Sequence, residues 1–216
     1  MACRSQSRLG ALKGGEVGVH VYRDEREAAD NFARLKSLVA ASEPALAALR
    51  AVRALGLDQW CLAAGAIRRL VWDDLHGFTR ATPLADWDCV FYDSAPQAPG
   101  REKSLEKSLV DRLPGVRWEV VNQAWVHEWL PPVVPGQIAV PFLSLAEGIA
   151  SWPETATCVG VWLTTDDNIE VIAPHGLRDL FQGVVRWNSA SASRAAFENR
   201  LKIKRWTQHW PWLVIA

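Results

Sequence analysis

The feature that most constrains the fold is an acidic pair, Asp86 and Asp88, directly before the apolar run Cys89-Val90-Phe91-Tyr92. The run predicts a strand over residues 86–93, in which side chains two positions apart project to the same face. The two carboxylates would then lie together, although adjacent like charges repel. Folding alone gains nothing from this arrangement, so the pattern predicts a cation between them. The alternative is a solvated pair on an exposed strand.

A strand, a small-residue turn and a helix are predicted upstream of this pair. Residues 60–63 are apolar, Ala64-Gly65-Ala66 follows, and apolar residues then recur on one helical face from residue 67 to Gly77. A glycine turn lets the backbone approach a phosphate at a helix N-terminus, where N–H groups and the helix dipole favour anions. Arg68 would lie in the first turn of this helix. Pairing with phosphate oxygens and a salt bridge to Asp73 or Glu119 are equally open for it.

Another acidic residue lies downstream in a predicted strand. Glu119 falls within the otherwise apolar stretch 116–121, where an unpaired carboxylate would carry a desolvation penalty. If this strand lies beside residues 86–88, Glu119 becomes a third carboxylate of the same site. The alternative is an edge-strand glutamate paired with Arg117 or Lys107.

Capping signals and periodicity define the remaining elements. Residues 1–20 predict a flexible tail, and Ser42 before Glu43-Pro44 predicts the start of a helix that ends near Gly56. A soft boundary is expected near Pro135. The other expected helices cover 24–41, 101–113, 143–152, 177–185 and a basic segment at 194–206, and residues 158–164 and 169–173 predict a hairpin.

Composition narrows the class of protein. The 216 residues carry 24 Lys plus Arg and 24 Asp plus Glu, so no global basic field marks a nucleic-acid-binding protein. Four widely spaced cysteines favour buried thiols over zinc or disulfides. The start of the chain lacks the apolar region of a signal peptide, and no apolar run is long enough to span a bilayer, so a cytoplasmic protein without a membrane partner is expected. The twelve tryptophans suit packing in the core and at its rim, with a stacking platform as the alternative.

The order of these motifs resembles the nucleotidyltransferase superfamily to which DNA polymerase beta belongs. In detail the chain is similar to a bacterial family of predicted nucleotidyltransferases, from about residue 40 to the end. The similarity rests on Ala64-Gly65-Ala66-Ile67-Arg68, Thr82-Pro83-Leu84-Ala85-Asp86-Trp87-Asp88, Trp118-Glu119-Val120-Val121-Asn122-Gln123-Ala124, Ser151-Trp152-Pro153-Glu154-Thr155-Ala156-Thr157 and Val171-Ile172-Ala173-Pro174-His175-Gly176-Leu177.

The resemblance implies an α+β fold, with a mixed sheet flanked by helices in a core over residues 21–135. Residues 136–216 would form a C-terminal α/β extension that packs on this core. Two departures are visible: Ala66 stands where the superfamily commonly has serine, and Trp125 stands where the family favours arginine. The first removes a hydroxyl contact to phosphate, and the second puts an anion-binding role at that position in doubt.

The chemistry implied is transfer of a nucleoside monophosphate from a nucleoside triphosphate. Asp86, Asp88 and Glu119 would be the catalytic carboxylates and ligands of Mg²⁺ or Mn²⁺, because hard oxygen ligands suit these ions and two metals clamp attacking and leaving oxygens. Gly65, Ala66 and Arg68 would contact the triphosphate.

The acceptor is left open among a small molecule, an RNA end and a protein side chain. The alternative function is a catalytically silent nucleotide-binding module of the same fold. A tryptophan-lined sugar- or base-binding protein without metal would leave the acidic pair unexplained. Asn122, Gln123 and His127 follow the third acid, and contacts to a base or acceptor compete there with ordinary capping and core hydrogen bonds.

Overall fold

A five-stranded mixed sheet organises the structure, a computed structural model that describes residues 16–96, 98–129 and 139–216. The strand order is β3-β2-β1-β4-β5. β2 and β3 are parallel, whereas β1 runs antiparallel to both of its neighbours and β5 runs antiparallel to β4. The strands are β1 (Trp60–Ala63), β2 (Trp87–Phe91), β3 (Trp118–Asn122), β4 (Gly160–Leu163) and β5 (Ile169–Ile172).

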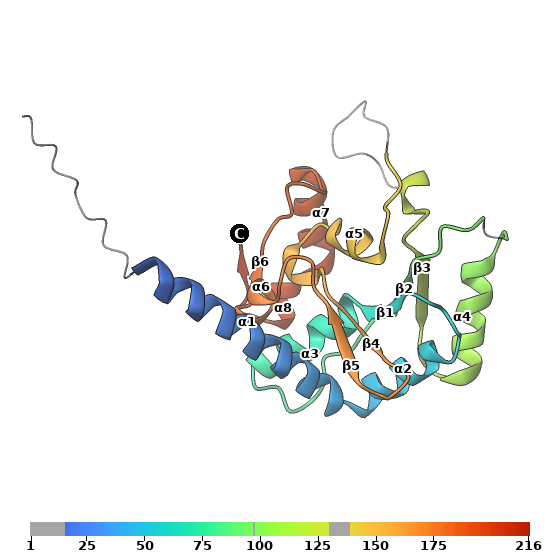
Figure 1. The fold of residues 1–216 in the computed structure, drawn as a ribbon, viewed down its shortest axis with the longest axis horizontal. Coiled ribbons are helices and arrows are strands. Elements are labelled where there is room, and N and C mark those ends of the chain that lie inside the picture. Colours follow the sequence, from blue (N-terminus) through green and yellow to red (C-terminus); the bar gives the residue numbers. More distant parts are fainter. Residues whose placement is uncertain (1–15, 97, 130–138) are drawn as a thin grey trace, which may run out of the picture.

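Helices connect these strands and cover the sheet. α4 links the parallel strands β2 and β3 and lies beside β3 at one side of the molecule, while α7 and α8 gather at the other (Figure 1). The helices are α1 (Glu16–Ala40), α2 (Glu43–Arg53), α3 (Gly65–Leu75), α4 (Arg101–Arg112), α5 (Leu145–Ala150), α6 (Arg178–Phe181), α7 (Arg194–Lys204) and α8 (Trp206–His209). Two 3₁₀ turns, η1 (Val126–Glu128) and η2 (Thr155–Thr157), and a small parallel pair, β6 (Val184–Val185) with β7 (Val214–Ile215), complete the described elements.

The fold class predicted from the sequence, α+β with a mixed sheet flanked by helices, is confirmed. Local signals also placed several ends correctly. Ser42 caps α2, since its hydroxyl accepts a hydrogen bond from the Ala45 N–H at 3.4 Å, and Gly56 has a positive φ of 71° after the helix.

Other predicted boundaries were wrong. α1 begins at Glu16, so residues 16–20 are helical, while the rest of the expected tail, residues 1–15, lies outside the described residues. The helix expected over 177–185 ends at Phe181, and Gly183, with φ 66°, turns the chain into β6. Arg205, with φ 47°, divides the expected last helix into α7 and α8.

The sheet crosses the boundary expected near Pro135, a position outside the described residues. The β4–β5 hairpin follows this boundary in sequence, yet β4 pairs with β1, placing Gly160 opposite Ala63. A Cβ on Gly160 would lie 2.3 Å from Cys61 Sγ, so only glycine permits this approach. Residues 139–216 therefore contribute two of the five strands, β4 and β5, and do not form only a layer packed on the core.

The interior contains three free thiols and a cluster of tryptophans. Cys61, Cys89 and Cys158 are buried and unpaired, as expected, whereas Cys3 lies outside the described residues. The buried Trp72 ring packs edge-on against Trp206 and Trp210, with centroids 5.8 and 5.2 Å away. Core packing is thus the role of these rings. None of the helices in the described ranges has the length and apolar character needed to cross a membrane.

Candidate active site

Two of the predicted carboxylates face each other on neighbouring strands. Parallel pairing of β2 with β3 sets Asp88 opposite Glu119, and antiparallel pairing of β2 with β1 sets Asp88 opposite Ala63. Asp86 lies directly before β2. The predicted adjacency of the Glu119 strand is confirmed.

Burial and neighbouring charge shift the protonation of Asp88. Burial, the Asp86 charge and the Glu119 charge raise its pKa from 3.8 to about 6, against the opposing effects of the Gly65 N–H and Arg68. The Gly65 N–H donates to Asp88 Oδ2 at 3.2 Å. The Asp88 carboxylate thus links β2 to the start of α3. Two further negative charges, those of Asp86 and Glu119, lie near it.

The turn between β1 and α3 is strained and lies against Asp88. Ala64 adopts φ 43° and ψ −109°, a conformation costly for a residue with a Cβ. A Cβ on Gly65 would lie 3.4 Å from Asp88 Oδ2, so this position keeps the backbone close to the carboxylate. Ala66 is 2 % exposed and packs in the core, so its side chain does not face the site.

Arg68 is buried beside this turn without a hydrogen-bonding partner. Its guanidinium carbon lies 4.7 Å from the Trp206 ring centroid and 5.2 Å from that of Trp72. Its Nε is unsatisfied, and the hydrogen bonds and ion pairs of the described residues do not include its guanidinium. Burial and then the charge of Arg200 lower its pKa from 12.5 to about 10, against the opposing charges of Asp88, Glu154 and Asp86. The salt bridge considered as an alternative for Arg68 is not formed.

The neighbouring Arg69 and Asp73 have structural partners instead. Arg69 Nη1 donates to the Thr82 carbonyl at 3.0 Å, while Thr82 donates from its N–H and its hydroxyl to the Asp73 carboxylate, at 2.8 and 2.6 Å. Asp73 also accepts from Trp210 Nε1 at 2.8 Å. These contacts fix the loop that leads into the acidic pair.

A cavity of about 370 Å³ opens beside Asp88 and Glu119. One wall is the sheet face and the segment after β3, and the opposite wall comes from the last third of the chain. The first wall includes Asp88, Val90, Glu119, Val121, Gln123 and Trp129, and the second includes Trp152, Pro153, Ala192, Ala196 and Arg200.

Arg200 is a charged residue of this cavity that the sequence did not single out. Its Nε lies 2.7 Å from Oε1 of the fully buried Glu154, a close ionic contact rather than an aligned hydrogen bond. Glu154 Oε2 accepts from the Thr157 hydroxyl at 3.1 Å. The guanidinium carbon also lies 5.7 Å from the Trp206 ring that Arg68 covers. In the sequence, Arg200 is one of five cations in a helix that reads as a solvated face.

Several expected features differ in the structure. Glu119 is exposed, so the desolvation that motivated its selection is absent, and its proposed pairing with Arg117 or Lys107 is not found among the described ion pairs. Within the described ranges no group of three or more His, Cys, Asp or Glu side chains lies close enough to hold a metal ion. Asp88 and Glu119 are therefore brought together, but a compact triad with Asp86 is not formed.

The polar residues after β3 divide into two kinds. Asn122 is a capping residue, because its Oδ1 accepts from the Asp93 N–H at 3.0 Å and its Nδ2 donates to the Asp93 carbonyl at 2.8 Å. The Trp125 ring lies 6.2 Å from His127, and its Nε1 donates to the same carbonyl at 3.2 Å. Gln123, by contrast, lines the cavity.

Comparison with known proteins establishes the family. Residues 50–215 match the sequence model of a family described as nucleotidyltransferase. The chain belongs to this nucleotidyltransferase family. The resemblance found in the sequence is thereby confirmed, and nucleotidyl transfer is the class of reaction that this nucleotidyltransferase performs.

Solved structures agree with this assignment. An NMR structure described as revealing a CCA-adding enzyme head domain is 26% identical, with a TM-score of 0.72 over 84% of this chain and 94% of that one. The Thermotoga maritima CCA-adding enzyme complexed with tRNA is 16% identical, with a TM-score of 0.51 over 86% of this chain, and there the similarity shows the fold alone. The nucleotidyltransferase spans 42% of that longer enzyme. No curated protein matches the chain.

Proposed function

We propose that this nucleotidyltransferase is an active, Mg²⁺-dependent enzyme that transfers a nucleoside monophosphate from a nucleoside triphosphate to a hydroxyl of its acceptor. The observation that carries the proposal is the buried, unpartnered Arg68 beside Asp88 and the start of α3. A buried guanidinium without a hydrogen bond is costly, and an anion held there would compensate it. The N–H groups at the start of α3 favour the same anion.

The carboxylates present fit a hard divalent cation. The charges of Asp86 and Glu119 both raise the pKa of Asp88, so a cation between these groups would relieve their repulsion. Mg²⁺ is commonly bound by one or two carboxylates together with substrate phosphates rather than by an all-protein cage. Asp88 with Asp86 or Glu119 would hold it, and Mn²⁺ suits the same ligands. When bound, the metal would neutralise charge on the phosphates.

The protein residues supply positioning and charge. Arg68 and Arg200 would pair with the outer phosphates, from the core and from α7 respectively, and Trp206 orients both guanidinium groups. Gly65 lets the backbone approach the triphosphate. Glu119 would take the proton of the attacking hydroxyl, which is the role its place opposite Asp88 suits. Positioning and charge neutralisation supply most of the catalysis in such transfers.

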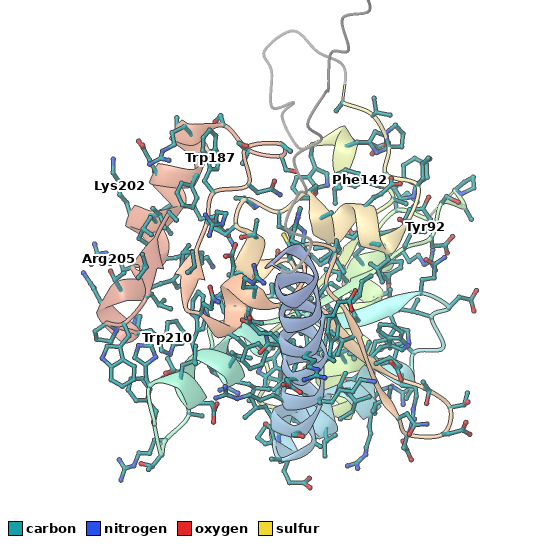
Figure 2. All side chains as sticks on the ribbon, turned by 60° about the vertical axis from the view of Figure 1, so that its left-hand side comes forward. Tyr92, Phe142, Trp187, Lys202, Arg205 and Trp210 are labelled. Atoms are coloured by element: carbon teal, nitrogen blue, oxygen red, sulfur yellow. The ribbon has the colours of Figure 1, made fainter. Side chains whose placement is uncertain are left out.

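Among the acceptors left open by the sequence, we favour an RNA end over a small molecule or a protein side chain. Support comes from the similarity to a CCA-adding enzyme head domain and from the exposed cations of α7. Lys202 on α7 and Arg205 directly after it project outward, and α7 also forms one wall of the cavity (Figure 2). Such cations suit contacts with a phosphate backbone.

The test combines binding and transfer. In Mg²⁺, calorimetry should show nucleoside triphosphate binding that Gly65→Val and Asp88→Asn each weaken severely, and RNA incubated with α-labelled nucleotide should become labelled as pyrophosphate is released. Absence of nucleotide binding would refute the site. Binding without transfer to RNA, a small molecule or protein in cell extract would support the silent binding module instead. Labelling of another acceptor alone would overturn only the RNA assignment.

A further inference from the structure

Along one face of the β2–β3 pair, the side chains change from charged to apolar to polar. Side chains alternate in a strand, so Asp88 and Val90 share a face on β2, and Glu119 and Val121 share that face on β3. Gln123 continues the pattern, because its backbone N–H donates to the Phe91 carbonyl at 2.7 Å and extends the ladder. The cavity floor therefore runs from carboxylates, over two valines, to a carboxamide.

The Gln123 side chain is held rigidly at the far end of this floor. A Cβ on Gly148 of α5 would lie 2.6 Å from Gln123 Cβ and 2.8 Å from its Oε1, so the two elements meet with no room for a side chain on α5. Gln123 is only 3 % exposed. The side chain is thus packed against α5 at the edge of the cavity that it lines.

The same carboxamide has no hydrogen-bonding partner in the described part of the chain, although it carries two donors and an acceptor. Gln123 is not among the described side chains whose polar atoms are both fully buried and unpartnered, so its carboxamide is reached from the cavity that the residue lines. Its hydrogen-bonding groups are therefore open to a ligand. A ligand that enters the cavity would supply its partner.

The surroundings define what that ligand is. Val90 and Val121 form an apolar bed, and Trp152 and Pro153 lie on the opposite wall. Phosphates are disfavoured on such a bed and would pair instead with Arg68 and with Arg200, whose guanidinium groups both lie against the Trp206 ring. A flat ring with a donor and an acceptor side by side on its edge satisfies a carboxamide in two hydrogen bonds, as adenine does for glutamine.

We propose that Gln123 reads the base of the donor nucleotide and sets which nucleoside triphosphate the enzyme selects. Gln123 lies four residue steps along extended chain from Glu119, roughly 13 Å at about 3.3 Å per step, which leaves room for the sugar and base between the acids and the amide. Gly148 is the positioning residue for this contact. The inference rests on the proposed nucleotide site and adds its specificity to it.

Equilibrium binding tests the proposal without an acceptor. Each of the four nucleoside triphosphates, and inorganic tripolyphosphate, is titrated in Mg²⁺ into the full chain, Gln123→Leu and the control Gln182→Leu, which alters an exposed glutamine outside the cavity. The parent should prefer one or two nucleotides. Gln123→Leu should lose roughly tenfold to a hundredfold in affinity for those and level the preference, with tripolyphosphate binding unchanged.

The outcomes separate the two proposals. Failure of the parent to bind any triphosphate refutes the proposed function itself. Tripolyphosphate binding with equal affinity for all four nucleotides, or an unchanged preference in Gln123→Leu, overturns the role of Gln123 alone. Because a core change can unfold the chain, Gln123→Glu gives a second reading: it keeps an acceptor oxygen, loses the donor, and should alter the order of preference rather than the affinity for tripolyphosphate.

Discussion

Asp88 is the central residue of the proposed metal site, and its buried carboxylate lowers the stability of the fold. Its side chain is mostly buried, lies opposite Glu119 and near Asp86, and is compensated mainly by one N–H group, that of Gly65. A carboxylate placed so that its pKa rises is stabilised in its protonated form. An aspartate at this position therefore serves function and lowers the stability of the metal-free protein.

Asp88→Asn is expected to stabilise the metal-free protein at neutral pH while abolishing binding of Mg²⁺ with nucleotide. The folded pKa of about 6 exceeds the unfolded value, so the parent loses stability as pH rises from about 4 through 6, on the order of 3 kcal/mol, and the variant lacks this contribution. Asn retains an oxygen for the Gly65 N–H. Urea denaturation in a chelator, below about pH 4 and above about pH 7, measures the difference. Identical pH slopes for parent and variant would refute the shifted carboxyl.

Glu119→Gln is expected to separate binding from chemistry. Because Glu119 is exposed and its proposed role is toward the attacking hydroxyl, the variant should keep near-normal triphosphate affinity while turnover falls by roughly 10²–10⁴, the size of a general-base contribution. Single-turnover rates with a labelled acceptor measure it. Asp111→Asn, an exposed acid on α4, is the control and should be unchanged. Turnover close to that of the parent would make Glu119 a structural residue and move the search for the base to Asp93 and His127.

The helix α3 assigns two adjacent arginines to different tasks. Arg69 bonds the Thr82 carbonyl and thereby holds the loop before β2, whereas Arg68 faces two tryptophan rings and has no hydrogen bond of this kind. The strained turn at Ala64 sets the direction from which both residues start. Two neighbouring arginines thus differ in role: Arg69 is structural, and Arg68 is a candidate ligand-binding residue.

Arg68→Met and Arg69→Met should therefore have opposite effects. Loss of Arg68 removes a buried charge whose pKa is lowered by desolvation, so stability should be kept or raised while tripolyphosphate affinity falls at least tenfold. Loss of Arg69 leaves the Thr82 carbonyl without its donor and should lower the free energy of unfolding by about 1–3 kcal/mol. Thermal melts and calorimetry on both variants test this. Equal destabilisation by the two changes would contradict the division.

The whole molecule builds its cavity from the middle of the chain and from its last third. Asp88 and Glu119 come from the central strands, while Trp152 and Arg200 come from segments more than thirty residues later. The Arg200–Glu154 ion pair connects α7 to the residues before η2, and Glu154 also forms an isolated bridge with Trp187. Glu154 therefore anchors the part of the cavity wall that contains Arg200.

Glu154→Gln should loosen this wall. Breaking the pair is expected to cost on the order of 1–3 kcal/mol, less than the roughly 3–5 kcal/mol of a fully buried pair because the Arg200 side chain is 33% exposed. Triphosphate affinity should fall with it, as Arg200 loses its orientation. Glu198→Gln, which breaks an exposed pair with Arg194 on the same helix, is the control and should change stability by at most about 0.5 kcal/mol. Similar losses in both variants would show that burial of Glu154 is unimportant.

The sequence by itself determined the features that local periodicity and capping encode. The strand that begins beside the acidic pair, the small-residue turn at Gly65 and the cap at Ser42 each depend on a few neighbouring residues, whose backbone preferences are set locally. The predicted strand over 86–93 is shorter in the structure, and Asp86 lies directly before it. The strand bearing Glu119 was also predictable, because its apolar pattern is continuous. These signals were sufficient for the fold class and for the family.

Only the tertiary structure decided which distant side chains share the site. In the sequence, Arg200 is one cation of a helix expected to face solvent, and only the structure shows that Glu154 holds it at the cavity. Gln123 was expected to make capping or core hydrogen bonds, and only the structure shows that it packs against Gly148. Glu119 was expected to be desolvated within its apolar strand and is exposed. The reason is physical: sheet order and the packing of α5 and α7 determine burial and long-range contact, and no local pattern of residues specifies them.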